Sequence, residues 1–266
     1  MKLWLAPLHG ITYYYFRNTF LRHFSGIDAI ITPFVPVQET NKLNVGKWLD
    51  FHSENNPYCD AIPQLMGNIP AHFTDTIRAL QDRYGFTQFN WNIGCPMNAI
   101  VRKQRGCGIM PFPDNVEAVV EEVFNKTDCR FSLKMRLGLK NRDEAYQIME
   151  RLNSYPIDFW VIHPRLGVEQ YAYTVDLENF AKLLTIAKAP IIYSGDILTP
   201  NDALLLQERF PQIDNIMLGR GILKNPFLAE QIQKKSSSVE TEEDWKIRFY
   251  NFYKDLALNY LSIKPE

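Results

Sequence analysis

Residues 189–220, APIIYSGDILTPNDALLLQERFPQIDNIMLGR, hold the repeating unit that decides the fold. The apolar runs at 189–195 and 214–220 predict strands. Between them, residues 200–209 predict a helix. Thr199 would cap this helix, and Pro200 would lie in its first turn. Two strands joined by a helix are typical of parallel pairing, because parallel strands need a long crossover connection.

The same alternation runs through most of the chain. Further strands are predicted at 3–8, 28–35, 61–67, 87–94, 131–137 and 158–164, and further helices at 70–84, 114–126, 141–154 and 175–187, with Asp114 and Asn141 as candidate caps. Eight strands, most of them followed by a helix, favour an α/β fold of the (β/α)8 TIM barrel type over a doubly wound open sheet. The turn after the first strand, APLHGITY, also lacks the G-x-G-x-x-G fingerprint of a dinucleotide-binding open sheet.

The character of the chain changes near residue 234. Residues 1–234 are therefore predicted to form the barrel, and residues 235–266 a linker and a C-terminal helical segment. In that segment Thr241 and Asp244 have the spacing of a capping box, and WKIRFYNFYKDLALNYL predicts an amphipathic helix. This helix either begins a small helical domain or closes the barrel.

Composition and charge exclude several classes of protein. Apolar residues make up 46% of the chain and charged residues 22%, which is typical of a globular protein. No run of 18 apolar residues predicts a membrane span, and the four cysteines have neither zinc-ligand nor disulfide-framework spacing. We therefore expect a protein without a metal in the reducing cytoplasm. The net charge of −1 gives no global indication of a nucleic-acid partner.

Polar side chains collect at the carboxyl ends of the predicted strands, where barrels of this type carry their active sites. The residues concerned are Gln64, Asn92, Cys95, Lys134, Arg136, His163, Arg165, Ser194, Gly195, Asp196, Gly219 and Arg220. The glycines after the last two strands can bring bare backbone N–H groups close to an anion, and Arg220 adds a positive charge. They indicate a phosphorylated ligand or cofactor; the alternative is that the glycines serve tight turns alone.

Cys95 lies in the stretch NWNIGCPMNAIVRKQRGCGIM, residues 90–110, where Gly94 and Pro96 fix the direction of its side chain. A thiol at this rim can act as a nucleophile or a proton donor, and nearby Lys or Arg residues would influence its pKa. The other cysteines, Cys59, Cys107 and Cys129, are interpreted as structural.

Positive charge is concentrated after two of the predicted strands. No Asp or Glu occurs between Phe86 and Pro113, whereas Arg102, Lys103 and Arg105 are all basic. Residues 129–142 also lack acids and carry further Lys and Arg residues. This distribution indicates a face that binds a polyanion, with a solvated basic surface as the alternative.

Taken together, these residues resemble those of the tRNA-dihydrouridine synthases. The resemblance covers residues 3–233 and rests on the order of AP-L-x-G, QLMG, N-x-G-C-P, K-x-R, H-x-R, G-D-I and M-L-G-R-G-x-x-x-N-P. It implies an FMN-containing barrel followed by a helical domain that helps to hold tRNA. It also implies reduction of tRNA uridines to 5,6-dihydrouridine, with NADPH as reductant and Cys95 as proton donor. The partner would be tRNA, and we expect a monomer.

The resemblance assigns roles to individual residues. The flavin would contact Pro7, Leu8, His9, Gln64, Lys134 and His163, and its phosphate and ribityl chain would contact Ser194, Gly195, Asp196, Gly219 and Arg220. The uracil and the RNA strand would contact Asn92, Arg102, Lys103, Arg136, Arg165 and Tyr171. Three positions depart from the usual family pattern: Tyr13 where an acid is common, Ser194 in place of Asn, and Leu166 in place of Thr.

Three other functions are compatible with parts of the pattern. The first is a flavin-dependent barrel oxidoreductase that acts on a free dihydropyrimidine or an enone, which would need no basic loop. The second is an aldolase-like barrel in which Lys134 forms a Schiff base. The third is a non-catalytic tRNA-binding module.

Overall fold

A computed structural model describes residues 1–42, 48–58, 61–234 and 241–263 of the 266-residue chain. The chain divides into two compact units. One unit contains Phe34–Lys47 and Ile62–Gly195, and the other contains Met1–Pro33, Trp48–Ala61 and Asp196–Glu266. Cys59 and most of the predicted linker, residues 235–240, lie outside the described residues.

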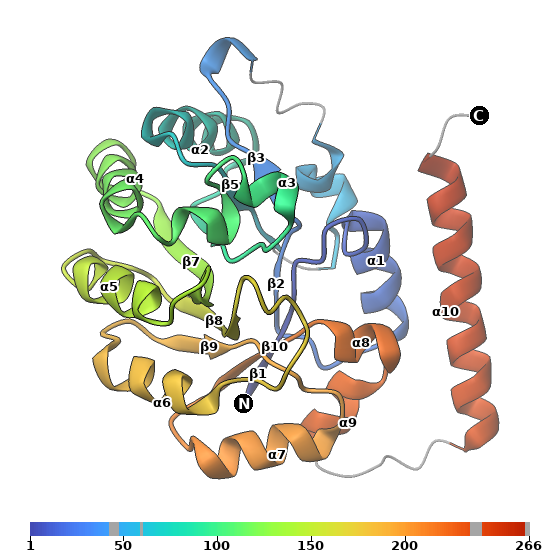
Figure 1. The fold of residues 1–266 in the computed structure, drawn as a ribbon. Helices are drawn as coiled ribbons and strands as arrows, with labels where there is room; N and C mark the ends of the chain where they lie inside the picture. Colours follow the sequence, from blue (N-terminus) through green and yellow to red (C-terminus); the bar gives the residue numbers. More distant parts are fainter. Residues whose placement is uncertain (43–47, 59–60, 235–240, 264–266) are drawn as a thin grey trace. The chain divides into compact units, whose positions relative to one another are not determined.

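The unit built around residues 62–195 contains a parallel sheet. Its strands are β3 (Val35–Pro36), β5 (Gln64–Met66), β6 (Gln88–Ile93), β7 (Arg130–Gly138), β8 (Trp160–Leu166) and β9 (Ile191–Tyr193), paired in that order. Between them run α2 (Pro70–Tyr84), the short α3 (Asn98–Val101), α4 (Pro113–Lys126), α5 (Asp143–Leu152) and α6 (Leu177–Ile186). Helices α2, α4, α5 and α6 lie along one side of this sheet (Figure 1).

The strand register brings the predicted residues Gln64, Asn92 and Lys134 close to two further polar residues, Asn90 and Ser132. Gln64 pairs with Asn90, and Asn90 in turn pairs with Ser132. One step further along the same face, Asn92 pairs with Lys134. Residues two apart on a strand share a face, so these side chains form two adjacent rows.

The other unit joins the two ends of the chain. Strand β1 (Lys2–Leu5) pairs in parallel with β10 (Asn215–Leu218) on one side and with β2 (Ala29–Ile31) on the other. Its helices are α1 (Tyr14–His23), α7 (Pro200–Arg209), α8 (Arg220–Lys224), α9 (Leu228–Lys234) and α10 (Glu242–Ile263). Two short 3-10 turns, Leu49–Phe51 and Ser53–Asn55, belong to this unit, and β4 (Ala61–Ile62) lies where the two units meet in sequence.

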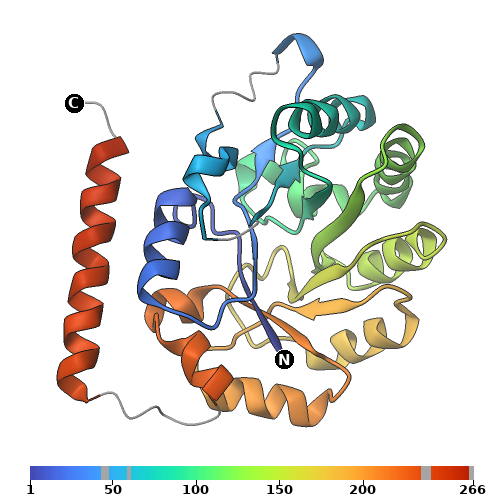
Figure 2. The same ribbon diagram turned by 180° about the vertical axis from the view of Figure 1, so that it is seen from behind.

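Helix α10 lies alongside α1 in both views (Figures 1 and 2). The buried ring of Phe252 packs edge-on against Phe16 and Phe24. His23 and Asp255 form an ion pair at 2.8 Å, and Asn259 donates a hydrogen bond to the Thr19 hydroxyl. Apolar packing and polar contacts therefore both hold α10 to α1.

Arg248 ties α10 to the rest of its unit. It pairs with Glu230 in α9, and its guanidinium lies 5.0 Å from the ring centroid of Phe24 and 4.5 Å from that of Phe227. Glu230 also accepts a hydrogen bond from the backbone N–H of Ser25. The Glu230 carboxylate therefore accepts hydrogen bonds both from α10 and from the segment that follows α1.

Acidification is expected to break this contact. Burial alone would raise the pKa of Glu230, but hydrogen bonds from Arg248 and Ser25 outweigh burial and hold that pKa below its ordinary value. A lowered carboxyl pKa adds stability above the unfolded-state value, and that stability is lost as pH falls through the folded-state value. We expect the fluorescence of Trp245, which stacks on Phe227, to change in a step below about pH 4.

The fluorescence of Trp245 is obtained as the difference between the wild type and Trp245→Phe. In Glu230→Gln the step should be absent. Glu242→Gln, which removes an exposed pair with Lys246 on the same helix, should keep it. A step that survives in Glu230→Gln would assign the transition to another group.

The main elements agree with the sequence-based predictions. Helices α2 and α7 have the predicted bounds, and Thr199 forms the expected cap with Asp202 as its reciprocal partner. Thr241 and Asp244 form the expected capping box. Within the described ranges, no helix combines the length and the apolar character needed to cross a membrane.

Two predicted caps were wrong. Helix α4 begins at Pro113, so Asp114 lies inside its first turn, where a carboxylate favours the helix dipole without capping it. Helix α5 begins at Asp143 behind Arg142, and Asn141 instead accepts a hydrogen bond from the Asp143 N–H.

Candidate active site

Cys95 lies on a turn that is held from two sides. Directly after β6, the side-chain oxygen of Asn92 accepts hydrogen bonds from the backbone N–H groups of Gly94 and Cys95, at 3.1 and 3.0 Å. On the other side, the carbonyl of Cys95 accepts from the N–H of Cys107 at 3.0 Å. A Cβ atom at Gly106 would lie 2.5 Å from that carbonyl, so the close approach requires glycine there, with φ of +55°. The direction of the Cys95 side chain is therefore fixed.

The environment keeps the Cys95 thiol protonated. Burial raises its pKa, and the backbone hydrogen bond from Met97 and the charges of Arg136 and Lys134 oppose that rise only in part. A thiol with a raised pKa carries its proton at neutral pH. Cys95 therefore has a proton to donate, and it is not activated as a nucleophile.

The other two described cysteines are buried, which agrees with their interpretation as structural residues. Cys107 is fully buried, and Cys129 is almost so. Burial raises the pKa of Cys107 to about 12, so this thiol stays neutral beside Cys95.

Lys134 lies next to Asn92 in the strand register and close to Cys95. Burial, followed by the like charge of Arg136, lowers its pKa to about 8. Within the described part of the chain, its ammonium group has no hydrogen bond or ion pair. A charged donor with these properties can bind an acceptor atom or an anion that enters from outside the protein.

Arg136 and Arg165 hold the loop that follows β8. Arg136 donates hydrogen bonds to the carbonyls of Gly94, Leu166 and Gln170, at 3.1, 2.9 and 2.6 Å. Arg165 donates twice to the Tyr173 carbonyl and also contacts a ring nitrogen of His163. Both guanidiniums are buried. Their hydrogen bonds link the Cys95 turn to residues 166–173.

Tyr171 is presented by this loop. Its ring lies edge-on to His163, with centroids 6.0 Å apart, and the Arg136 guanidinium lies 5.3 Å from its centroid. About half of the Tyr171 side chain is exposed. The flanking residues Gln170 and Tyr173 have φ of 50° and 64°, a conformation that costs non-glycine residues free energy. The loop therefore relies on the two arginines to hold its shape.

The basic residues after β6 face solvent. Arg102 and Lys103 are exposed at the end of α3, and neither forms an ion pair within the described ranges. Asn68 fixes the backbone beneath them by donating a hydrogen bond to the Lys103 carbonyl and accepting one from Arg105. Their charges are therefore available to an anion in solution.

Ser194 and Gly195 follow β9 in the same unit. The N–H of Ser194 donates to the Ile162 carbonyl at 2.9 Å, which continues the pairing of β8 with β9. A Cβ atom at Gly195 would overlap the hydroxyl of Tyr193, so this position requires glycine. The anion-binding role predicted for the backbone after β9 stays a prediction.

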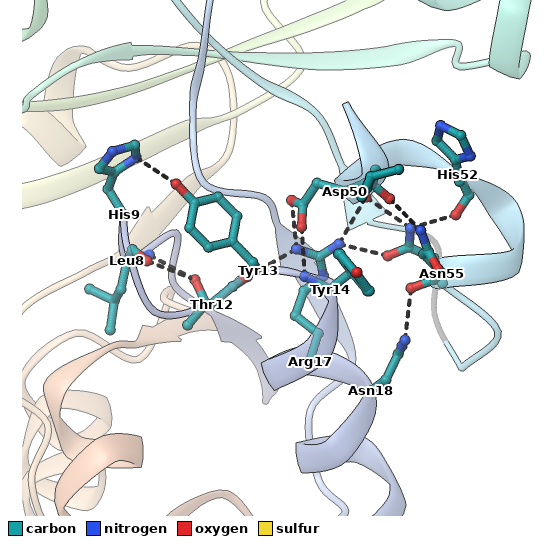
Figure 3. Close-up of polar contacts among 12 residues, drawn as sticks. Leu8, His9, Thr12, Tyr13, Tyr14, Arg17, Asn18, Asp50, His52 and Asn55 are labelled. Carbon is teal, nitrogen blue, oxygen red and sulfur yellow. Dashed lines mark hydrogen bonds and ion pairs between the residues drawn. The ribbon is translucent and has the colours of Figure 1, made fainter. Parts of the chain in front are cut away.

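The remaining predicted residues belong to the unit that contains β1 and β10. Pro7, Leu8 and His9 follow β1 in a loop that Thr12 organises, because its hydroxyl accepts from the Leu8 N–H at 2.8 Å (Figure 3). A ring nitrogen of His9 lies 3.2 Å from the hydroxyl of Tyr13.

After β10, Arg220 pairs with Asp196, so both residues belong to one local cluster. Gly219 lies against Ala6, since a Cβ atom placed there would be 3.4 Å from the Ala6 methyl group. The ends of β1 and β10 therefore present Leu8, Gly219 and Arg220 on neighbouring backbones.

A buried ion pair that was not predicted from the sequence supports the β1 loop. The fully buried Arg17 donates to Asp50 at 2.9 Å, to the Thr12 carbonyl at 2.9 Å and to Asn56 at 2.7 Å. Asp50 also accepts from the N–H of Tyr14, the first residue of α1, at 2.6 Å (Figure 3). No sequence signal links residue 50 to residue 17, because the segment around residue 50 has no regular apolar period.

Comparison with known proteins gives a consistent set of relatives. A family model described as dihydrouridine synthase (Dus) matches residues 4–260. The tRNA-dihydrouridine(16) synthase of Pseudomonas syringae pv. tomato is 29% identical over 248 residues, covering 90% of this chain and 77% of that protein. The corresponding protein of Aquipseudomonas alcaligenes is 26% identical, covering 91% and 78%. A probable tRNA-dihydrouridine synthase of Helicobacter pylori is 24% identical, covering 89% and 71%.

Solved structures confirm the fold. The old yellow enzyme homologue of Zymomonas mobilis superposes with a TM-score of 0.60 at 13% identity, covering 92% of both chains. A variant of the same Zymomonas mobilis protein gives a TM-score of 0.57 at 14% identity. The chain is therefore an α/β TIM barrel, as predicted, and the doubly wound open sheet is excluded.

Proposed function

The chain belongs to the dihydrouridine synthase family and is a flavin-dependent oxidoreductase, and on this premise we propose its reaction in detail. It reduces specific uridines of tRNA to 5,6-dihydrouridine, with FMN as cofactor, NADPH as reductant and Cys95 as proton donor. The observation that carries the proposal is the Cys95 turn, which Asn92 and the Cys107 N–H hold from two sides and to which Arg136 is hydrogen-bonded.

The residues present fit a flavin. The Lys134 ammonium has no hydrogen bond or ion pair within the described residues, and its lowered pKa suits it to a ring oxygen or to a ring that gains negative charge. Gln64 and His163 would complete the surroundings of the ring, with Pro7, Leu8 and His9 from the β1 loop. Ser194, Gly195, Asp196, Gly219 and Arg220 would hold the phosphate and the ribityl chain of FMN.

When bound, the flavin supplies a hydride equivalent to carbon-6 of the uracil. Cys95 gives its thiol proton to carbon-5, so that an S–H bond breaks as a C–H bond forms. The thiolate that remains is stabilised by the charges of Arg136 and Lys134, which already oppose the rise of its pKa. It recovers its proton from water before the next turnover. Both hydrogens of the reduced base are thereby accounted for.

The substrate side of the site would use the remaining predicted residues. Arg102 and Lys103, exposed and without ion pairs within the described residues, would contact RNA phosphates while the uridine leaves its stack. Tyr171 presents an aromatic face beside Arg136, which suits contact with a base. Arg136, Arg165 and Asn92 hold the backbone that lines this side.

The proposal is tested by incubating the purified protein with NADPH and with tRNA isolated from cells that lack dihydrouridine. We expect flavin absorbance in the protein and a gain of two hydrogens at specific uridines by nucleoside mass spectrometry. Reduction of a free enone or oxidation of a free dihydropyrimidine, with tRNA untouched, would favour the first alternative. A colourless protein in which borohydride traps a ketone on Lys134 would favour the aldolase.

Lys134→Met is expected to weaken flavin binding about tenfold, the value of one hydrogen bond from a charged donor. Because the pKa of Lys134 is about 8, the wild-type side chain is charged below that pH and neutral above it. Flavin affinity should therefore fall as pH rises through 8 in the wild type and stay flat in Lys134→Met. Quenching of flavin fluorescence on binding measures the affinity of each protein and its dependence on pH. Lys182→Met, an exposed lysine of α6 in the same unit, should behave like the wild type. Equal affinities for wild type and Lys134→Met would remove Lys134 from the flavin site.

A further inference from the structure

A buried hydrogen-bonded chain of side chains begins under β7 and leads toward the active site. The Ser132 hydroxyl donates to the Phe89 carbonyl at 3.1 Å. The side-chain amide of Asn90 donates to the Ser132 oxygen at 2.9 Å. The amide of Gln64 then donates to the side-chain oxygen of Asn90 at 2.8 Å. Ser132, Asn90 and Gln64 are all completely buried, so water does not complete their hydrogen bonding.

The chain ends at the backbone of Cys95. The side-chain amide of Asn92 donates to the oxygen of Gln64 at 2.8 Å. The oxygen of Asn92 is thereby left facing Gly94 and Cys95, whose N–H groups it accepts. Three strands, β5, β6 and β7, contribute to a single path that starts at a carbonyl and ends at the Cys95 turn.

The direction of this path is set at its far end. A backbone carbonyl can only accept, so the Ser132 hydroxyl must donate to Phe89 and can only accept from Asn90. The amides of Asn90, Gln64 and Asn92 must therefore each donate an N–H to the preceding side chain. The oxygen of each then accepts a hydrogen bond from the next group along the path. The last oxygen belongs to Asn92 and meets two N–H groups. Without Ser132 and Asn90, the orientation of the Gln64 amide is no longer set from the far end, and Asn92 is held only by the two N–H groups that its oxygen accepts.

We propose that Asn90 and Ser132 are positioning residues for the Cys95 thiol, acting through Gln64 and Asn92. This inference rests on the role of Cys95 in the proposed function. Both residues are completely buried, and within the described residues neither has a hydrogen bond to the Cys95 turn. Their contribution is to fix the Asn92 oxygen and hence the turn from which the proton is delivered.

The test compares Asn90→Ala and Ser132→Ala with Thr76→Val. Thr76 is equally buried in the same unit, and its hydroxyl accepts one hydrogen bond, from the Gln38 N–H, so its replacement is a matched loss of one buried acceptor. We expect kcat for tRNA reduction to fall about tenfold in Asn90→Ala and about threefold in Ser132→Ala, with KM unchanged, because small displacements of a reacting group are costly. Thr76→Val should leave kcat unchanged.

A second readout needs no flavin. In the flavin-free protein, iodoacetamide should alkylate Cys95 severalfold faster in Asn90→Ala and Ser132→Ala than in the wild type, because a loosened turn exposes the thiol and lets its pKa fall. Peptide mass spectrometry should show unchanged alkylation of Cys107 and Cys129. The signature is a thiol that is more reactive chemically and slower in catalysis. Equal acceleration at Cys95, Cys107 and Cys129 would indicate general destabilisation and overturn the proposal.

A double-mutant comparison separates this inference from the function on which it rests. In a Cys95→Ala background, Asn90→Ala and Ser132→Ala should cost no further activity, since they act through the missing thiol. A loss of the same size in both backgrounds would overturn the positioning role while leaving the proposed function intact. Full turnover in Cys95→Ala alone would instead overturn the proton-donor role, and the positioning role with it.

Discussion

Cys95→Ala is expected to lower the rate of tRNA uridine reduction by about 10² to 10⁴, the usual contribution of a positioned general acid. Burial keeps the thiol protonated, and the hydrogen bond from its N–H to Asn92 fixes its direction. The methyl group of alanine has no proton to give. The measurement is the single-turnover rate at which tRNA reoxidises the reduced flavin in the absence of oxygen.

Flavin content and tRNA affinity should be unchanged in Cys95→Ala, because the substitution removes a single sulfur atom at a half-buried position. Cys107→Ala is the matched control. Cys107 contacts the same turn, but its own thiol is buried with a pKa of about 12. We expect its activity to stay within about twofold of the wild type, as for a substitution away from the reacting atoms. Undiminished turnover in Cys95→Ala would assign proton donation to water or to another group.

Arg17→Met is expected to lower the free energy of unfolding by about 3–5 kcal/mol, because it leaves the partner of a buried ion pair without its countercharge. Arg17 is completely buried, and its guanidinium joins Asp50, Asn56 and the Thr12 carbonyl. Asp50 also accepts from the first N–H of α1, whose N-cap residue Tyr13 makes no capping hydrogen bond. The substitution therefore affects both the pair and the start of the helix.

The loss should depend on pH. Burial raises the pKa of Asp50, and the Arg17 charge opposes that rise. Without Arg17 the pKa of the carboxyl rises further, so at lower pH the carboxyl takes a proton and the cost of burying its charge disappears. The difference in unfolding free energy between the wild type and Arg17→Met should therefore be larger at pH 8 than at pH 5, as measured by urea denaturation.

Arg130→Met provides the control for Arg17→Met. Arg130 forms an ion pair with Asp158 at 2.8 Å, but 65% of its side chain is exposed. An exposed pair of this kind contributes up to about 1 kcal/mol. Similar losses from the two substitutions would mean that the Arg17 pair contributes no more than a surface contact.

The parts of the site that sequence could predict are those that local patterns specify. The apolar run before Cys95, the glycine and proline that flank it, and the capping box at Thr199 each involve residues a few positions apart. The face shared by Lys134 and Arg136 follows from the two-residue period of a strand. Ser132 lies two residues before Lys134, so the same period could have placed it in the row that leads to Asn90.

The parts that could not be predicted depend on partners remote in sequence or on backbone atoms. Asp50 and Arg17 are 33 residues apart, and the segment around Asp50 has no periodicity to place it. Arg136 and Arg165 were predicted as substrate ligands, and most of their hydrogen bonds go to backbone carbonyls, which every residue possesses and no sequence pattern marks. That assignment to the substrate side stays a prediction.

The pairing of β1 with β10 and of α1 with α10 carries a consequence for the order in which the protein forms on the ribosome. Strand β1 and helix α1 are completed by partners that are synthesised much later, from residue 215 onward. The unit built on residues 62–195 has its strands and helices in consecutive order and can assemble as it emerges. We therefore expect the nascent N-terminal segment to wait, with its aromatic residues uncovered, until β10 and α10 have been synthesised. Contacts that span almost the whole chain form slowly, so this is the stage at which a chaperone would be needed most.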